Sequence, residues 1–248
     1  MHMSKDLICC ICRNEAMRFA ERYLTTLGLP VTGKPAADVN HLLLPVPAFP
    51  SGDQYLPHIL SDLPENVIIS GGNLHSPLLT SYHTVDFLQD PYYLAHNAAI
   101  TADCTLKMIR SEISNLEDIP VLILGWGRIG KCLGSILSKE RADVTIAARK
   151  DTDLAMIRAL GCRSISINSI QEECSHHRIV LNTVPAMILP LPDFSPDCLA
   201  LDLASVSGMA GANVRPARGL PGKMMPAESG KLIAETFIRL SLRKEWCK

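Results

Sequence analysis

The chain has 248 residues, of which 47% are hydrophobic and 20% are charged. This length accommodates one large or two modest domains with real cores, and the composition excludes an intrinsically disordered protein. The formal net charge is −1, with the two signs mixed along the chain, so no basic stripe predicts a nucleic-acid partner.

The first apolar segment is too short to target the chain to a membrane. Residues 7–12 are apolar, but Arg13 follows them directly, so we expect neither a signal peptide nor a membrane span and predict a cytoplasmic protein. The nine cysteines are scattered and odd in number, which favours reduced thiols over a disulfide framework. Cys9 and Cys12 form a C-x-x-C pair, but no second pair accompanies it. We interpret both as small strand residues and expect no metal site.

Residues 1–96 predict a small α/β domain. A buried strand at 7–12 precedes a helix that Asn14 caps and Gly28 ends. Arg13 stands where a nucleotide-binding turn would have glycine, so this first turn is not expected to hold a pyrophosphate. Ser70 and Gly71 follow a later strand. The further strands of this domain are expected at 42–46, 67–69 and 84–88.

A helical pattern begins at Asn97 and continues to about Ile113. We assign residues 97–116 to an interdomain helix, because a long helix directly before a nucleotide-binding domain commonly joins two domains. Its first residues are then expected at the mouth of a cleft.

The next segment carries the strongest motif of the chain. Four apolar residues lead into Gly125-Trp-Gly127-Arg128-Ile129-Gly130, and a helical pattern follows. This order of strand, glycine turn and helix is what a dinucleotide site requires. Gly125 permits the tight turn, Gly127 lets the backbone approach a pyrophosphate, and Gly130 allows close packing of the helix on the strand. The N–H groups at the helix start supply anion binding.

Residues 117–225 alternate strands and helices, which predicts a doubly wound Rossmann domain. Two of its buried strands become polar at their ends. Because ligands bind at the carboxyl ends of such strands, we predict that these ends help to bind the cofactor; the alternative is that they only cap turns. The residues concerned are Asn182, Thr183, Val184, Pro185, Ala204 and Ser205. A last helix within 226–248 is expected to pack back onto the first domain.

The end of the second strand of this domain indicates the type of nucleotide. An NAD site usually has a carboxylate there, whereas this chain has Ala148-Arg149-Lys150. Two cations suit a 2′-phosphate, and a guanidinium binds phosphate with two hydrogen bonds. We therefore expect NADP(H) rather than NAD(H); the alternative is a solvated basic pair at a helix start.

Several segments together resemble a known family. The segments are Val121–Gly130, Val144–Arg149, Leu181–Leu189, Leu201–Ser205 and Gly219–Gly222. In order and spacing they resemble the A subunit of dipicolinate synthase over about residues 97–240. The first domain is similar only through Leu43-Leu-Pro-Val46 and Ile68-Ile-Ser-Gly71.

The resemblance implies a two-domain, NADP-binding oxidoreductase subunit that acts in spore formation. Members of the family work with a flavoprotein-like B subunit, and together they convert a dihydrodipicolinate precursor into dipicolinate. They carry Asn-Ser-x-Pro-Thr-x-Glu-Gly at the interdomain helix. Here Asn97 and Thr101 are kept and Asp103 is a shorter acid, while the Ser, Pro and Gly of the motif are lost.

Oxidation of a dihydropyridine to a pyridine moves a hydride to nicotinamide and a proton to a base. Asp103 is the first candidate for that base, with Asn97 and Thr101 beside it, and Asp202 and Glu228 are further candidates. The alternative for Asp103 is an ordinary carboxylate in the first helical turn. The donors expected for a small dicarboxylate substrate are Arg218, Lys223 and the segment at Ser70 and Gly71.

Three functions remain open. The first is an oxidoreductase like the A subunit of dipicolinate synthase, with the flavoprotein-like B subunit of that enzyme as its partner. The second is an NADP-dependent dehydrogenase of another small carboxylate, and the third is a non-catalytic NADP-binding partner subunit. In each case we expect a homo-oligomer.

Overall fold

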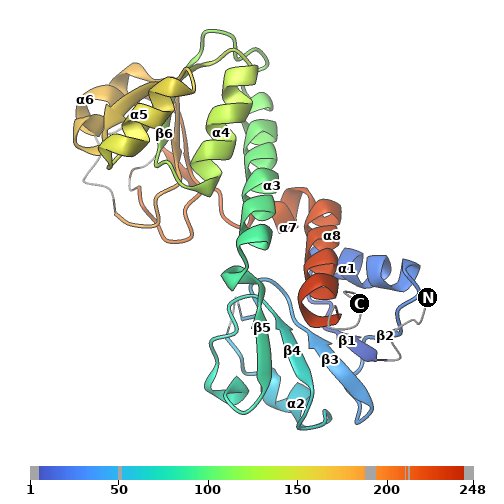
Figure 1. Ribbon diagram of the computed structural model, residues 1–248. Helices are drawn as coiled ribbons and strands as arrows, with labels where there is room; N and C mark the ends of the chain where they lie inside the picture. Colours follow the sequence, from blue (N-terminus) through green and yellow to red (C-terminus); the bar gives the residue numbers. More distant parts are fainter. Residues whose placement is uncertain (1–5, 50–51, 188–193, 210, 212, 243–248) are drawn as a thin grey trace. The chain divides into compact units, whose positions relative to one another are not determined.

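The computed structural model describes residues 6–49, 52–187, 194–209, 211 and 213–242 (Figure 1). Two compact units divide the chain: unit 1 comprises Met1–Asn97 and Pro221–Lys248, and unit 2 comprises Ala98–Leu220. Residues 188 and 189 of the family-like segment and residues 243–248 of the expected C-terminal segment lie outside the described residues.

Unit 1 contains a five-stranded parallel sheet in the order β2-β1-β3-β4-β5. Its strands are β1 (Leu7–Cys10), β2 (Val31–Thr32), β3 (Val39–Leu43), β4 (Ile68–Gly71) and β5 (His83–Asp86). The strand expected at 42–46 begins earlier and ends at Leu43, because Pro45 and Pro47 cannot donate to a ladder. The short edge strand β2 was not predicted.

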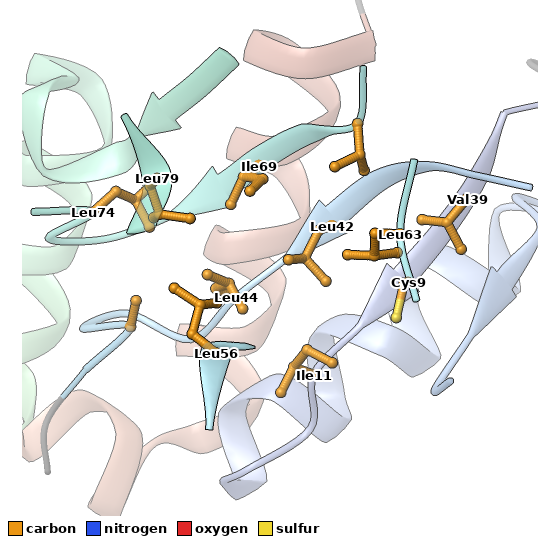
Figure 2. Packing of buried hydrophobic residues seen from close by; sticks show 12 residues of the cluster. Cys9, Ile11, Val39, Leu42, Leu44, Leu56, Leu63, Ile69, Leu74 and Leu79 are labelled. Carbon is orange, nitrogen blue, oxygen red and sulfur yellow. The ribbon is translucent and has the colours of Figure 1, made fainter. Parts of the chain in front are cut away.

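An aliphatic core forms where the strands of unit 1 meet the short helix α2 (Leu56–Leu60). Figure 2 shows side chains of β1, β3 and β4 gathered with Leu56 of α2 and with leucines of the loops. Cys9 belongs to this core and is fully buried. The 3₁₀ turns η1 (Pro77–Leu79) and η2 (Phe87–Gln89) precede and follow β5.

Two helices from opposite ends of the chain pack together in unit 1. They are α1 (Glu15–Thr26) and α8 (Pro226–Phe237), which lie side by side in Figure 1; a π-helical turn, η5 (Ile238–Leu242), extends α8. A Cβ atom on Gly230 would lie 2.3 Å from the carbonyl oxygen of Ala16 and 2.6 Å from Cβ of Phe19. The expected packing of the C-terminal helix onto the first domain is therefore confirmed. The short helix α7 (Leu220–Met224) leads into α8.

The long helix α3 (Pro91–Arg110) begins six residues before the position predicted for it. Asp90 precedes it and accepts a hydrogen bond from the N–H of Tyr93 (2.7 Å), and proline suits the first helical position because its missing N–H would have no intrahelical acceptor. The prediction that Asn97 starts the helix is wrong. Thr101 and Asp103 consequently stand in its middle rather than in its first turns.

Unit 2 contains a six-stranded parallel sheet in the order β11-β10-β9-β6-β7-β8. The strand order reverses at β6, with β7 and β8 on one side and β9 to β11 on the other. This is the Rossmann arrangement, and the predicted fold class is therefore confirmed. Its strands are β6 (Pro120–Leu124), β7 (Asp143–Ala148), β8 (Arg163–Ser166), β9 (Ile179–Asn182), β10 (Leu199–Asp202) and β11 (Val214–Pro216). Its helices are α4 (Arg128–Lys139), α5 (Asp151–Ala159) and α6 (Ile170–Glu173), with the 3₁₀ turns η3 (Ile167–Ser169) and η4 (Cys174–His176) around α6.

The local signals for helix ends are confirmed at some positions and wrong at one. Asn14 caps α1 by accepting the N–H of Met17 (2.9 Å), and Gly28 and Gly161 follow their helices with φ of 77° and 86°. The spacing of Ser169 and Glu172 is that of a capping box and predicts a capped helix start, but Ser169 makes no side-chain cap and α6 is a single turn. A helix of four residues offers too little length for that motif to matter.

Candidate nucleotide-binding site

A cavity of about 510 Å³ opens in unit 2 at the carboxyl ends of β6, β7 and β9. This is the edge of the sheet where doubly wound folds bind ligands. Its lining brings together residues predicted from three separate segments: Gly125 and Gly127, Arg149 and Lys150, and Thr183, Val184 and Pro185.

Each glycine of the turn has its own structural reason. Gly125 has a φ of 103°, and a Cβ there would lie 2.7 Å from Oγ1 of Thr183. A Cβ on Gly130 would lie 2.1 Å from the carbonyl oxygen of Gly125, so any side chain would push α4 off β6. A Cβ on Gly127 would meet no atom within 4 Å. Gly127 therefore leaves open space at the cavity, as close approach of a pyrophosphate requires.

The first turn of α4, which follows the cavity residue Gly127, carries backbone donors. Gly127 is its N-cap and no side chain caps the helix, while the first turn contains no acidic residue. The N–H groups of Arg128, Ile129 and Gly130 therefore lack intrahelical acceptors. With the positive end of the helix dipole, they form an anion site that needs no cationic side chain.

The loop after β9 is held in place by Asn182. This fully buried side chain donates to Oδ1 of Asp202 (2.8 Å) and accepts the N–H of Val184 (3.0 Å). Thr183 donates its hydroxyl to the carbonyl oxygen of Leu124 (2.9 Å). Asn182 therefore shapes the cavity wall formed by Thr183, Val184 and Pro185, but it does not line the cavity itself.

The end of β10 forms a second buried network, which explains three of the predicted residues. Asp202 is 1% exposed and accepts from the N–H of Gly208 (3.1 Å) as well as from Asn182. Arg218 donates Nε to the carbonyl oxygen of Ala204 (2.9 Å) and lies 3.7 Å from Oδ2 of Asp202. Arg218 and Ala204 thus fix this strand end, and Asp202 is a hub of hydrogen bonds rather than an exposed base. Ser205 is exposed just beyond it.

Sequence reasoning missed part of the cavity beside β7 and β8. Arg149 and Lys150 are exposed and Lys150 is the N-cap of α5, but Asp153 of the same helix also lines the cavity. Asn168, which follows β8, lines it as well, together with Trp126 from the glycine turn. The strand-end rule that selected the ends of β9 and β10 would also have found Asn168, had it been applied to β8.

The structure separates the three residues predicted for catalysis. Asn97 and Thr101 are four residues apart and share a face of α3, whereas Asp103 lies about 160° around the helix from Thr101. Thr101 is buried and Asp103 is exposed. Burial and, secondarily, the charge of Asp103 raise the pKa of the Cys132 thiol on α4, so Asp103 lies on the α4 side.

None of the residues predicted to bind substrate lines the cavity of unit 2. Ser70 is fully buried and its hydroxyl lies 2.8 Å from that of Ser241. A Cβ on Gly71 would lie 3.0 Å from Cβ of Leu44, so this backbone is packed against the residue that follows β3 rather than open to a ligand. Lys223 is exposed on α7.

The C-x-x-C segment occupies β1 and the turn after it. Burial, with smaller contributions from Cys12 and Glu21, raises the pKa of the Cys9 thiol to about 11. Cys12 lies 3.3 Å from Oε2 of Glu21. A thiol that stays protonated is a poor nucleophile and metal ligand, which is consistent with a packing role for Cys9. Among the described residues no three His, Cys, Asp or Glu side chains are grouped to hold a metal, and no described helix meets the length and apolarity of a membrane span.

Comparison with known proteins relates this chain to one family. No family model matches the sequence. The A subunit of dipicolinate synthase from Bacillus subtilis (strain 168) is 29% identical over 157 residues, which cover 58% of this chain and 53% of that protein. The matched segment thus spans about half the length of the curated relative.

Solved structures extend the similarity to nearly the whole fold. The A subunit of dipicolinate synthase from Bacillus halodurans superposes with a TM-score of 0.82 at 18% identity, covering 96% of this chain and 98% of that one. The A chain of dipicolinate synthase from Bacillus subtilis gives 0.79 at 21% identity and 96% coverage of both chains. The resemblance predicted from the motifs is confirmed, and the solved structures show that the fold is shared over nearly the whole chain.

Proposed function

We propose that this chain is an oxidoreductase of the dipicolinate synthase type that uses NADP to form dipicolinate from a dihydrodipicolinate precursor. The observation that carries the proposal is the cavity of unit 2, where an open glycine turn faces two cationic side chains. The proposed partners are a small dicarboxylate substrate and the flavoprotein-like B subunit of dipicolinate synthase. The sequence similarity to a protein named as a synthase subunit supports the choice of reaction.

The residues of the cavity fit a dinucleotide. The open space at Gly127 and the N–H groups of Arg128 and Ile129 accommodate a pyrophosphate, which a side chain at position 127 would obstruct. Arg149 and Lys150 stand where a 2′-phosphate would be bound, and they favour NADP over NAD. Asp153 lines the same cavity, and its carboxylate is the group that would accept a hydrogen bond from the ribose 2′-hydroxyl of NAD.

When bound, the nicotinamide supplies the hydride acceptor for the oxidation of a dihydropyridine ring. The chain itself must orient the two rings and receive one proton. Thr183, Val184 and Pro185 form a fixed wall of the cavity for the ring, because Asn182 and Leu124 hold that loop. We keep Asp103 as the proposed proton acceptor, since its carboxylate is exposed on α3.

The test is a reconstituted assay with the full chain, the flavoprotein-like B subunit, dihydrodipicolinate and NADP⁺, in which dipicolinate is followed by terbium luminescence. Dipicolinate formation that needs the chain is the expected result. Asp103→Asn should lower turnover by about 100-fold or more if its carboxylate acts as the general base. Glu117→Gln, an exposed acid outside the cavity, is the matched control.

A second candidate is supported by α3. Asp103 does not share the face of Asn97 and Thr101, so the altered segment 97–104 is also compatible with an NADP-dependent dehydrogenase of another small carboxylate. NADP binding without dipicolinate formation, but with turnover of another carboxylate, would favour this candidate. Binding without any turnover would favour a non-catalytic NADP-binding subunit.

A further inference from the structure

A second cavity, of about 350 Å³, lies entirely within unit 1. Arg13 and Asn14 from the β1–α1 turn line it, with Pro45 and Ala48 from the segment after β3 and Tyr55 beside α2. In the strand order β2-β1-β3-β4-β5, the chain passes from β1 to its neighbour on one side, β2, and then crosses to its neighbour on the other side, β3. The carboxyl ends of β1 and β3 therefore meet at the topological switch point, where open parallel sheets bind ligands.

Arg13 is held in this cavity by an aromatic ring rather than by an acid. Its Cζ lies 3.4 Å from the centroid of the Tyr55 ring, and no described carboxylate pairs with it. The ring itself is fixed, because the Tyr55 hydroxyl donates to the carbonyl oxygen of Ala48 (2.5 Å). A guanidinium stacked on its flat face keeps its N–H edge available in the plane, which is the geometry that binds a carboxylate with two hydrogen bonds.

The start of α1 adds backbone donors on the same side. Asn14 accepts the N–H of Met17, which leaves the N–H groups of Glu15 and Ala16 without intrahelical acceptors. The Glu15 side chain is turned to Arg18. Asp53, the acid closest to Tyr55 in sequence, accepts a hydrogen bond from Ser76 and does not line the cavity. The cavity thus has one cation, an exposed guanidinium stacked on Tyr55, and a helix start, with apolar Pro45 and Ala48 and polar Gln54 in the rest of its lining.

We propose that this cavity binds one carboxylate of a small planar carboxylate ligand, with Arg13 as the bidentate donor stacked on Tyr55. A single cation and a helix start match one negative charge, and the volume, with Pro45, Ala48 and the Tyr55 ring in the lining, matches a ring-sized ligand. Arg13 occupies the position where a pyrophosphate-binding turn would have glycine, and in this proposal its guanidinium binds the carboxylate of the ligand. Assigning the ligand as the substrate rests on the proposed function; the carboxylate site itself does not.

Isothermal titration of the full chain with defined probes tests the proposal. The probes are pyridine-2,6-dicarboxylate, benzene-1,3-dicarboxylate and inorganic phosphate, and NADPH binding and thermal melting report whether each variant is intact. Arg13→Met should raise the dissociation constant of the dicarboxylates by about tenfold or more, and Arg13→Lys should raise it less. Arg22→Met is the matched control, because Arg22 also stacks on a ring of α1, that of Phe19, but lies outside the cavity.

The outcomes separate this site from the proposed function. Binding of benzene-1,3-dicarboxylate that depends on Arg13, without dipicolinate formation in the reconstituted assay, would support the site and reject the function. Dipicolinate formation with an unchanged KM in Arg13→Met, together with unchanged binding of both dicarboxylates, would reject the site and keep the function. The proposal also fails if neither dicarboxylate binds, if Arg13→Met and Arg22→Met weaken binding equally, or if phosphate binds as tightly and with the same dependence on Arg13.

Discussion

At the scale of single residues, the proposed preference for NADP over NAD rests on Arg149. Arg149→Glu should raise the dissociation constant for NADPH by about 10- to 100-fold, because a charge-assisted phosphate contact is replaced by repulsion, and should change that for NADH by less than about threefold. Fluorescence titration of both nucleotides measures the difference. Arg158→Glu, at the other end of α5 and outside the cavity lining, controls for the change in net charge. Equal effects on NADPH and NADH would contradict a 2′-phosphate contact.

His41 makes unit 1 sensitive to pH. Burial lowers the pKa of this imidazole, and the charge of Asp6 opposes the shift only in part. The residue is 4% exposed and its ring packs edge-on against Phe237. Its Nδ1 has no hydrogen-bond partner among the described atoms. As pH falls below about 6.5, the unfolded chain therefore takes up the proton before the folded chain does. The free energy of unfolding then decreases by up to about 1.4 kcal/mol per pH unit.

His41→Leu should flatten this dependence. Urea unfolding at about pH 7.5 and about pH 5.5, on either side of the ordinary histidine pKa, measures it. The urea midpoint of the wild type should be lower at the acidic pH than at the higher pH. The midpoint of His41→Leu should decrease distinctly less. Parallel pH profiles would show that His41 does not titrate on unfolding.

Residues whose role follows from backbone geometry could be predicted from the sequence, whereas residues whose role depends on a distant partner could not. Gly125, Gly127 and Gly130 act as the motif implies, because the constraint lies within one short turn. Asn182 and Arg218 were expected to face a ligand. Their partners, Asp202 and Ala204, stand 20 and 14 residues away in the chain, and only the folded sheet brings them together.

At the scale of elements, the α1–α8 contact depends on a glycine. Gly230→Ala improves helix propensity by up to about 1 kcal/mol, but its Cβ would stand 2.3 Å from the Ala16 carbonyl oxygen. We expect a net loss of about 1–3 kcal/mol from overpacking, measured by urea unfolding. Gly222→Ala on α7, where a Cβ meets no atom within 4 Å, should be neutral or stabilising. A neutral Gly230→Ala would show that the two helices can separate at little cost.

The elements that the sequence misplaced have identifiable physical causes. Strands buried on both faces, such as β6 and β9, are continuous apolar runs and were found. The edge strands β2 and β11 have only two and three residues, too few to produce a pattern. The first two turns of α3 are rich in polar and aromatic residues, so periodicity alone delayed the start of the helix, although Asp90-Pro91 was a visible start signal.

At the scale of the whole molecule, the two ends of the chain belong to one unit. A chain that stops at Met225 lacks α8 and leaves the apolar face of α1 without its partner. We expect limited proteolysis to degrade residues 1–97 of this truncated chain and to leave unit 2. NADPH binding should stay within about threefold of the full chain, because every residue lining that cavity lies between 125 and 187. A chain that stops at Leu242 is the control. Loss of NADPH binding on truncation at Met225 would show that unit 2 depends on unit 1.

Unit 1 is formed by two segments with unit 2 between them, so its folding can be completed only after unit 2 has been synthesised. Its sheet leaves the ribosome first, but α8 is synthesised only after all of unit 2, whose chain is continuous and free to fold in the meantime. The nascent N-terminal segment therefore has the Ala16–Ala20 side of α1 uncovered until α8 has been made, and during this time it is a natural client for a chaperone. A nonsense mutation between unit 2 and α8 would accordingly damage the earlier-made unit 1 more than unit 2, which is made just before the stop.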